Sequence, residues 1–251
     1  MDAGAPLKPA AASVFGIAAD RTVDSSSRER ITSGNESLIG NPFADLDAFA
    51  NVALNYRRVK RGENAFRAGD KFNAIYAVRS GFFKTGITDA VGRGQVIGFF
   101  MRGELFGLEG IGAGRYDGTA TALEDSEIAV LPFALMEDMA RKDPAMQRRL
   151  YAILSREIAR DKGVMMLLGS MSAEARLATF LINLSTRFLR RGCSPSDFVL
   201  RMSRAEIGSY LGLKLETVSR LFSSFQKSGL LEVQQKHVRI LDTKGLQRVL
   251  V

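Results

Sequence analysis

The sequence predicts an α+β protein in which an antiparallel β-roll of the jelly-roll type is followed by a long helix and a winged helix-turn-helix. Three observations lead to this fold class. Short alternating strands separated by turn residues fill residues 52–132. Apolar residues then recur at three- and four-residue steps from Pro144 to Leu168, which is the period of a helix. The last third of the chain carries a two-helix pattern centred on Gly212.

The composition excludes several classes of site. The chain has 251 residues, of which 46% are hydrophobic and 25% are charged, and these values describe a globular protein that can bury a core. It contains one cysteine, Cys193, and one histidine, His237. A single thiol cannot build a four-cysteine zinc site or a cysteine-held iron–sulfur cluster, so we expect no metal and no such cofactor. We also find no nucleophile set or paired acid and base, and therefore do not expect an enzyme.

No segment predicts a membrane span. The most apolar run, residues 164–168, is short and is bounded by glycines. Because the chain is also almost free of cysteine, we expect a cytoplasmic protein without a membrane partner.

The positive charge is concentrated in the last third of the chain. From Ser172 to the C-terminus there are thirteen Lys and Arg against six Asp and Glu, which accounts for +7 of the total net charge of +8. A basic block of domain size predicts a polyanionic partner, nucleic acid before a membrane surface, because neutralised phosphates release counterions. Charge alone leaves a solubilising surface open as the alternative.

Four segments follow from the composition and the periodicity. Residues 1–40, rich in Ala, Ser and Gly, predict a flexible arm. Residues 41–140 predict a β-roll domain that begins with a short helix over 41–51. A dimerisation helix is expected over 141–170, and a winged helix-turn-helix DNA-binding domain over 171–251. The strands expected in the β-roll lie at residues 74–78, 81–87, 96–100 and 127–131.

The long helix predicts a homodimer, because a long apolar seam often pairs with a second copy of itself. Pro144 can start this helix. In a parallel pair, two Asp161 carboxylates would approach each other across the axis and oppose association. The alternative is a rotated seam in which Asp161 faces solvent. The expected seam consists of Leu154, Ile158, Asp161, Met165 and Leu168.

The basic block has the packing pattern of a helix-turn-helix. Gly208 supplies the small residue of the first helix, and Gly212 supplies the turn. Ser203 and Glu206 have the spacing of a capping box at the start of the first helix. The apolar packing positions are filled by Ile207, Leu211, Leu213, Val218 and Leu221.

The second helix presents residues that can read base edges. Arg220 can donate two parallel hydrogen bonds to a guanine, Glu216 can accept from a cytosine, and Ser219 can contact either type of edge. The alternative for Glu216 and Arg220 is an exposed ion pair within the helix. A hairpin wing is expected over 230–241, with His237 near its tip. Contacts to the DNA backbone are expected from Ser203, Lys214, Thr217, Ser223, Lys236 and His237.

Six segments of the chain resemble those of a known protein family. They are residues 66–70 (FRAGD), 75–81 (IYAVRSG), 103–107 (GELFG), 208–213 (GSYLGL), 216–221 (ETVSRL) and 225–229 (FQKSG). Together they resemble the CRP/FNR family of bacterial transcription regulators, specifically the FNR branch, over about residues 42–250. The resemblance implies a cyclic-nucleotide-binding-like sensor domain, a homodimer, double-stranded DNA as ligand and contacts with RNA polymerase. In that branch an E-x-x-S-R motif reads a TTGAT half-site, and this role carries over to Glu216, Ser219 and Arg220.

The chain departs from the family at both known kinds of sensor site. FNR holds an oxygen-sensing cluster through cysteines in the arm and the β-roll, where this chain has none, so no Fe–S cluster is expected. For cyclic AMP, Glu109 stands where the family places a ribose contact, but the arginine that pairs with the phosphate is missing beside Asp117. Arg115, one residue early, keeps a nucleotide in the β-roll open as an alternative. A redox switch at Cys193 is a further alternative, and the signal itself is not predicted.

Overall fold

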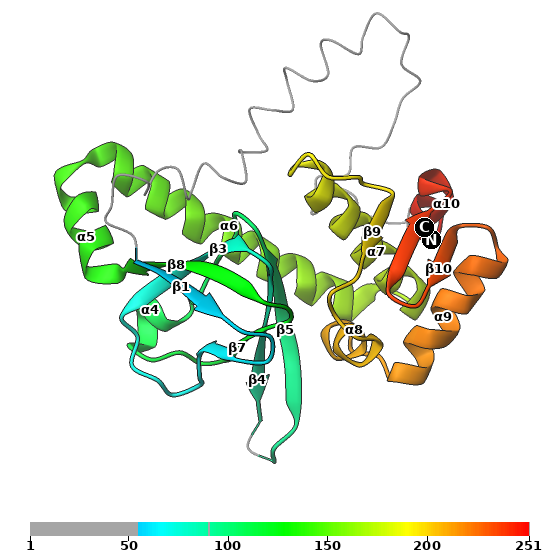
Figure 1. Cartoon of the computed structure of the whole chain (residues 1–251), viewed down its shortest axis with the longest axis horizontal. Coiled ribbons are helices and arrows are strands. Elements are labelled where there is room, and N and C mark those ends of the chain that lie inside the picture. Colours follow the sequence, from blue (N-terminus) through cyan, green and yellow to red (C-terminus); the bar gives the residue numbers. More distant parts are fainter. Residues whose placement is uncertain (1–54, 90, 251) are drawn as a thin grey trace, which may run out of the picture.

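The computed structural model describes residues 55–89 and 91–250. The predicted flexible arm and the predicted helix over 41–51 lie outside the described residues. Figure 1 shows the β-roll and the C-terminal winged helix side by side, with one long helix running behind both. No helix among the described residues is both long and apolar enough to cross a bilayer.

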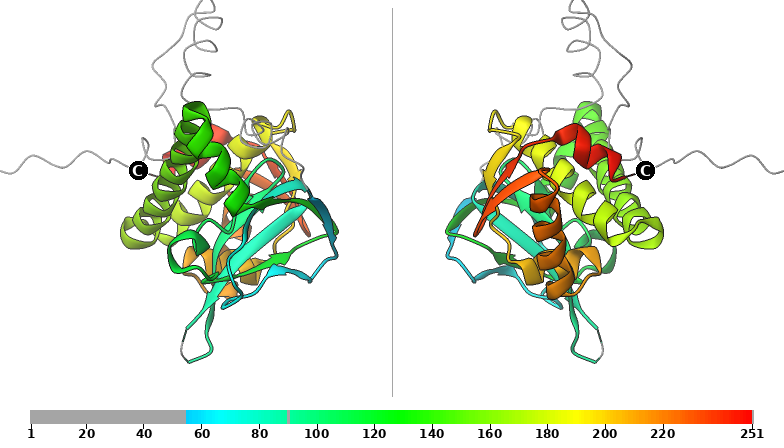
Figure 2. Two further views of the ribbon diagram at one scale, coloured as in Figure 1. Left: turned by 90° about the vertical axis from the view of Figure 1, so that its left-hand side faces the viewer. Right: turned by 90° about the vertical axis from the view of Figure 1, so that its right-hand side faces the viewer.

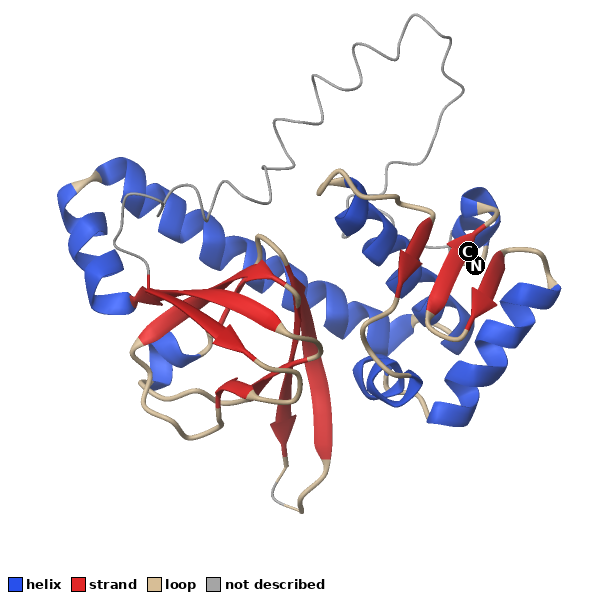
Figure 3. Ribbon diagram, viewed as in Figure 1, coloured by secondary structure: helices blue, strands red, loops and turns tan. Residues whose placement is uncertain are grey.

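The β-roll consists of two antiparallel four-stranded sheets, drawn in red in Figure 3. The first has the order β1 (Asn55–Val59), β8 (Ser126–Pro132), β3 (Ala74–Ser80) and β6 (Leu105–Phe106). The second has the order β2 (Asn64–Phe66), β7 (Thr119–Ala122), β4 (Phe82–Thr88) and β5 (Gly94–Met101). A short helix, α4 (Gly110–Ala113), follows β6. The β4–β5 hairpin projects beyond the rest of the β-roll (Figure 2).

Strand β3 is covered on both faces, which explains why its sequence is a continuous apolar run. Tyr76 and Val78 face the interior of the β-roll, where aromatic side chains gather. Ile75 and Ala77 point the other way and pack against the helices that follow the β-roll. Alternate residues of a strand face opposite sides, so a strand that is covered on both faces has no polar positions in its middle.

Two helices follow the β-roll. Helix α5 (Phe133–Lys142) was not predicted, and it packs through the buried Met136. The expected boundary at residue 140 falls inside α5. Helix α6 (Pro144–Ser170) is the predicted long helix: Pro144 is its first residue, and the Asp143 carboxylate accepts a hydrogen bond from the Ala145 amide.

The C-terminal part contains the predicted helix-turn-helix and wing together with two elements that were not predicted. Strand β9 adds to the wing, whose sheet order is β10-β11-β9, and helix α10 follows the wing. The elements are α7 (Ala173–Leu189), β9 (Asp197–Val199), α8 (Arg204–Leu211), α9 (Leu215–Lys227), β10 (Leu231–Gln234), β11 (His237–Ile240) and α10 (Thr243–Arg248).

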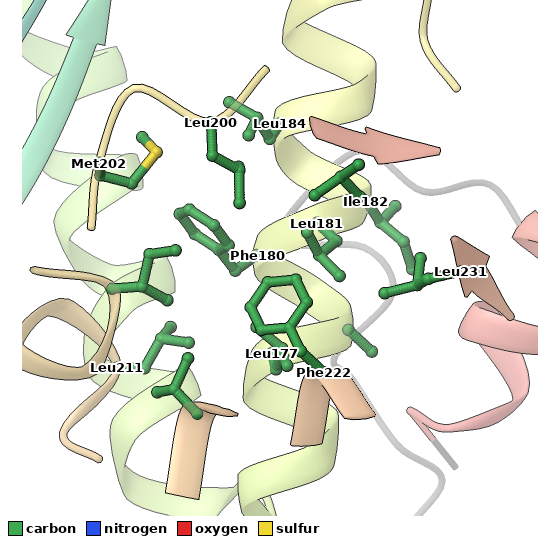
Figure 4. Close-up of a cluster of buried hydrophobic side chains, with 14 of the residues drawn as sticks. Leu177, Phe180, Leu181, Ile182, Leu184, Leu200, Met202, Leu211, Phe222 and Leu231 are labelled. Carbon is green, nitrogen blue, oxygen red and sulfur yellow. The ribbon is translucent and has the colours of Figure 1, made fainter. Parts of the chain in front are cut away.

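One apolar core joins the winged helix to the β-roll. Figure 4 shows Leu177 and Leu181 of α7 facing Leu211 of α8 and Phe222 of α9. The same buried cluster includes Val96, Phe99 and other residues of the β4–β5 hairpin. The four segments proposed from the sequence stay predictions, but the structure shows that the third and fourth are packed on the second.

Candidate nucleic-acid interface

The close approach of α8 and α9 depends on two glycines. Gly212 ends α8 with φ of 63°, a left-handed conformation that favours glycine. At Gly208, a Cβ atom would lie 2.6 Å from the Leu213 carbonyl oxygen. The Leu213 amide instead donates to the Gly208 carbonyl at 2.8 Å. Only glycine therefore allows the two helices to cross at this distance.

The predicted capping box at the start of α8 is confirmed. The Glu206 amide donates to the Ser203 hydroxyl, and the Ser203 amide donates to a Glu206 carboxylate oxygen at 2.7 Å. Burial raises the pKa of Glu206, but hydrogen bonds from Lys84 and Ser203 outweigh it and hold the pKa below its usual value. The side-chain oxygen of Ser203 is thus engaged in the cap, and its contact with DNA stays a prediction.

Helix α9 has one buried face and one exposed face. Its buried residues are Val218, Leu221, Phe222 and Phe225. The exposed residues include all three predicted base readers, Glu216, Ser219 and Arg220. A side chain rooted on a helix with such a well-packed back is held in place for an external partner.

The ion pair that the sequence left open is absent. Neither Glu216 nor Arg220 makes a hydrogen bond or an ion pair with any residue that the structure describes. Arg220 and Ser219 instead line an open groove, together with Ser223, Ser224 and Lys227. Both charged groups of the E-x-x-S-R motif are therefore free to contact a ligand.

The residues predicted to contact the DNA backbone differ in their exposure and in their hydrogen bonds. Lys214 precedes α9 and is exposed, without a side-chain cap to the helix. Thr217 is half-buried, and the Ser223 hydroxyl donates to the Ser219 carbonyl at 3.1 Å. In the wing, Lys236 donates to the Arg201 carbonyl at 3.2 Å.

His237 lies beside the wing turn rather than at its tip. The turn is formed by Gln235, whose φ is 55°, and by Lys236. His237 is the first residue of β11, and its Nε2 lies 2.5 Å from a carboxylate oxygen of Asp197 on β9. The carboxylate that holds this ring is also paired with Arg239. A phosphate contact from His237 stays a prediction.

Arg204 is a candidate functional residue that the sequence did not predict. Its guanidinium lies over the Phe222 ring, 3.3 Å from the centroid, and Nη2 is 3.5 Å from the Gln235 carbonyl. Its Nη1 is buried without a hydrogen-bond partner among the described residues. Burial lowers the pKa of Arg204 to about 10. Arginine as the first residue of α8 was the only sequence signal, and it does not reveal that the wing and α9 meet there.

The predicted dimer seam is partly exposed and partly packed within the chain. Ile158 and Met165 are 56% and 72% exposed, and Tyr151, seven residues before Ile158, is 59% exposed. Asp161 is exposed on the same helix, α6. In contrast, Leu154 packs against the β-roll and Leu168 against the winged helix. An apolar stripe at seven-residue spacing is thus left uncovered.

Aromatic side chains pack in the interior of the β-roll, where the sequence left a nucleotide open as an alternative. Phe66 and Tyr116 stack there at 3.9 Å between ring centroids, and the Tyr116 hydroxyl donates to the Ala74 carbonyl at 2.6 Å. Arg115, the alternative phosphate partner, is exposed and donates to the Gly69 carbonyl at 2.7 Å.

The expectation that the chain holds no iron–sulfur cluster stays a prediction. Cys193 is exposed in the loop between α7 and β9, outside the strands of the β-roll. The described residues contain no group of three or more His, Cys, Asp or Glu side chains that could hold a metal ion.

Two protein-family models match the chain. The cyclic nucleotide-binding domain matches residues 56–143, and the Crp-like helix-turn-helix domain matches residues 175–249. The transcriptional activator protein FnrA of Stutzerimonas stutzeri is 47% identical over 203 residues, which cover 80% of this chain and 83% of that protein. This chain belongs to the CRP/FNR family of transcription regulators. The predicted fold class and family are therefore confirmed, and the helix-turn-helix is a DNA-binding domain.

Other relatives place this CRP/FNR regulator near the FNR branch. The fumarate and nitrate reduction regulatory protein of Escherichia coli K12 is 39% identical over 205 residues, 82% of each chain. Among solved structures, FixK2 from Bradyrhizobium japonicum has a TM-score of 0.73 and 28% identity, and the match covers 79% of this chain and 98% of that one. FnrA is named as a transcriptional activator, and the Escherichia coli protein is named as a regulatory protein.

Proposed function

We propose that this CRP/FNR regulator is a homodimer that reads a palindrome of two TTGAT half-sites. Glu216, Ser219 and Arg220 read the bases, and Lys214 with Lys236 contacts the DNA backbone. The observation that carries the proposal is the exposed face of α9, where the charges of Glu216 and Arg220 have no partner among the described residues. An unpaired arginine on a rigid helix can donate two hydrogen bonds to one guanine.

The exposed stripe on α6 supports the homodimer. Tyr151, Ile158 and Met165 repeat every seven residues, which is the spacing of a coiled-coil seam. A second copy of α6 would cover these side chains, and two copies of α9 would then face two half-sites. Asp161 lies within this stretch and opposes the pairing through like charge.

In this proposal, the signal that controls the regulator is neither detected by an iron–sulfur cluster nor carried by cyclic AMP. A single exposed thiol cannot hold iron and sulfide, and the stacked pair Phe66 and Tyr116 occupies the space inside the β-roll. Relatives named as transcriptional activators support a contact with RNA polymerase. We place the protein in the cytoplasm, where chromosomal DNA is available to it.

Binding to defined duplexes tests the DNA reading. We expect the purified chain to bind a TTGAT palindrome at two chains per duplex, with at least about a hundredfold preference over a scrambled palindrome at the same salt concentration. The matched control is a duplex with one half-site intact and one scrambled, which should bind more weakly because one recognition helix loses its contacts. Equal affinity for the intact and scrambled palindromes would show that the chain does not read this sequence.

Sedimentation tests the dimer. At one low concentration, Asp161→Ala should contain a larger dimer fraction than the wild type, because the like charges at the seam are removed. Asp143→Ala is not a suitable control because it removes a helix cap; Glu137→Ala, exposed on α5, is. Identical dimer fractions for wild type and Asp161→Ala would show that Asp161 is not at the seam.

Metal analysis tests the absence of a cluster. The purified protein should contain no stoichiometric iron or acid-labile sulfide, and it should bind the palindrome equally with and without oxygen. If oxygen dependence appeared and then vanished in Cys193→Ser, a thiol switch would replace this part of the proposal.

A further inference from the structure

A carboxylate of the β-roll is held by two arginines of the winged helix. Glu104, in the turn between β5 and β6, accepts from Arg187 at 2.5 and 3.0 Å and from Arg191 at 2.6 Å. Arg187 lies in the last turn of α7, and Arg191 lies in the turn that follows the helix, where its Nη1 donates to the Arg187 carbonyl at 2.6 Å. The ion pairs therefore cross directly from one part of the protein to the other.

The backbone of the β-roll holds all three side chains in position. Arg187 also donates to the Phe99 carbonyl at 2.7 Å, and Arg191 to the Arg102 carbonyl at 2.6 Å. Glu104 accepts from the Met101 amide at 3.0 Å. Burial raises the pKa of Glu104, but the two guanidiniums outweigh it and hold the pKa below its usual value. We call Glu104, Arg187 and Arg191 the interdomain clamp.

A second contact fastens the helix-turn-helix itself. Strand β5 is at the edge of its sheet, and its Val96 amide donates to the Ser209 hydroxyl of α8 at 2.8 Å. Gln95 donates to the Ser209 carbonyl, and Lys84 of β4 pairs with Glu206 at 2.8 Å. Helix α8 thus takes the place that another strand would have beside β5.

Aromatic side chains fill the space between these polar contacts. Phe99 of β5 lies 6.1 Å from Phe180 of α7 and 5.3 Å from Tyr210 of α8, measured between ring centroids. A largely buried clamp beside an apolar centre allows little rotation of one part against the other. At the same time, the exposed residues of α9 remain uncovered, so this contact does not block the DNA-reading face.

Reading a palindrome requires a defined distance and orientation of two recognition helices, about one turn of DNA apart. That geometry depends on how each winged helix is held relative to α6, which carries the proposed dimer seam. We propose that the interdomain clamp fixes the winged helix on the β-roll and thereby sets the half-site spacing that the dimer accepts. The inference rests on the proposed function, because it presupposes a dimer on two half-sites.

A spacing series tests the clamp. The palindrome is made with the spacer that the wild type binds most tightly and with one base pair added or removed, which rotates one half-site by about 35° relative to the other. We expect the wild type to lose about tenfold or more in affinity when the spacer changes, because the protein or the DNA must deform. In Glu104→Gln the two guanidiniums lose their counter-charge, and we expect the loss to shrink to about threefold or less.

Matched variants separate the clamp from general damage. Glu127→Gln removes an ion pair with Arg79 inside the β-roll and should keep the wild-type spacing preference. Arg191→Lys keeps the charge but cannot reach both Glu104 and the Arg102 carbonyl as a guanidinium does, and it should relax the preference partly. Binding to a duplex with one half-site reports on the fold of the winged helix and should change less than about twofold in each variant.

The outcomes for the clamp and for the proposed function differ. Relaxed spacing in Glu104→Gln with unchanged half-site binding supports the clamp. A folded Glu104→Gln or Arg191→Lys protein with the wild-type spacing preference overturns it, while the DNA reading stands. A wild type that shows no preference for any palindrome overturns the proposed function itself.

Discussion

The arginines of the winged helix fall into two groups that the structure uses in opposite ways. Arg220 on α9 is exposed and has no partner among the described residues. Arg187, in the last turn of α7, and Arg191, in the turn that follows it, are largely buried, and both pair with Glu104 of the β-roll. The first group is available to an external anion, whereas the second is neutralised within the chain. A count of positive charge therefore overstates the surface available to DNA phosphates.

Other arginines of the basic block confirm this division. Arg176 donates to three backbone carbonyls, among them that of Leu211 in α8. Arg239 pairs with Asp197 and Glu232 within the wing sheet. A guanidinium presents five donors in a fixed plane, so it can join elements by several carbonyls at once as well as read a base.

The largest effect is expected from a substitution that disrupts the packing of α8 against α9, because this packing is part of the scaffold that carries both groups of arginines. Gly208→Val would place a Cβ against the Leu213 carbonyl, so α8 and α9 could not keep their crossing. We expect the free energy of unfolding to fall by about 3 kcal/mol. Thermal unfolding and binding to the palindrome should both show the loss. Ala205→Val, at an exposed position of the same helix, is the control and should cost less than about 1 kcal/mol; similar losses for both variants would contradict the packing argument.

Loss of the exposed group alone should change DNA reading and leave the fold intact. Arg220→Ala should weaken binding to the TTGAT palindrome by about 1–3 kcal/mol and flatten the preference at the base it reads. A binding series over all four bases at each half-site position measures this. If Arg220→Ala kept the wild-type base preference at every half-site position, Arg220 would not be a residue that reads a base.

Lys214 sharpens the comparison within the exposed group, because it is expected to contact phosphate rather than a base. Lys214→Ala should weaken binding to specific and scrambled duplexes alike, and it should lower the slope of log affinity against log salt by about one. Affinities over a range of salt concentrations give the slope. If only the specific duplex were affected, Lys214 would be a base reader instead.

The smallest effect is expected from the partly buried carboxylate of Glu157, which is paired with one arginine where Glu104 is paired with two. Burial raises the pKa of Glu157 on α6 to about 7, although Arg160 pairs with it and opposes the shift. Because the folded pKa is above the unfolded one, the folded protein binds the extra proton. The stability of the wild type relative to Glu157→Gln should therefore fall as the pH rises from about 5 to about 8. Unfolding temperatures across this range measure the difference, with Glu137→Gln on the exposed face of α5 as the control; a difference that is constant with pH would contradict the shift.

The sequence by itself determined the helix-turn-helix, because the residues that specify it are close together in the chain. The Ser203–Glu206 cap, the small residue at Gly208 and the turn at Gly212 all act within two successive helices, where a 3.6-residue period places each side chain. Helix α6 could be predicted for the same reason, through its period and Pro144.

Only the tertiary structure decided which residues are available to a ligand and which stabilise the fold. Strand β9 is three residues long and forms because β11, some forty residues later, pairs with it, so no local pattern announces it. The clamp joins Glu104 to an arginine 83 residues away. The Arg204 Nη1, which has no hydrogen-bond partner in the part of the chain that the structure describes, is found only where α8, α9 and the wing meet. Periodicity reports which side of an element faces the core, but it does not report what packs against that side. Burial and pairing between distant segments supply that information, because a charge is costly to bury without a partner and harmless when it is exposed.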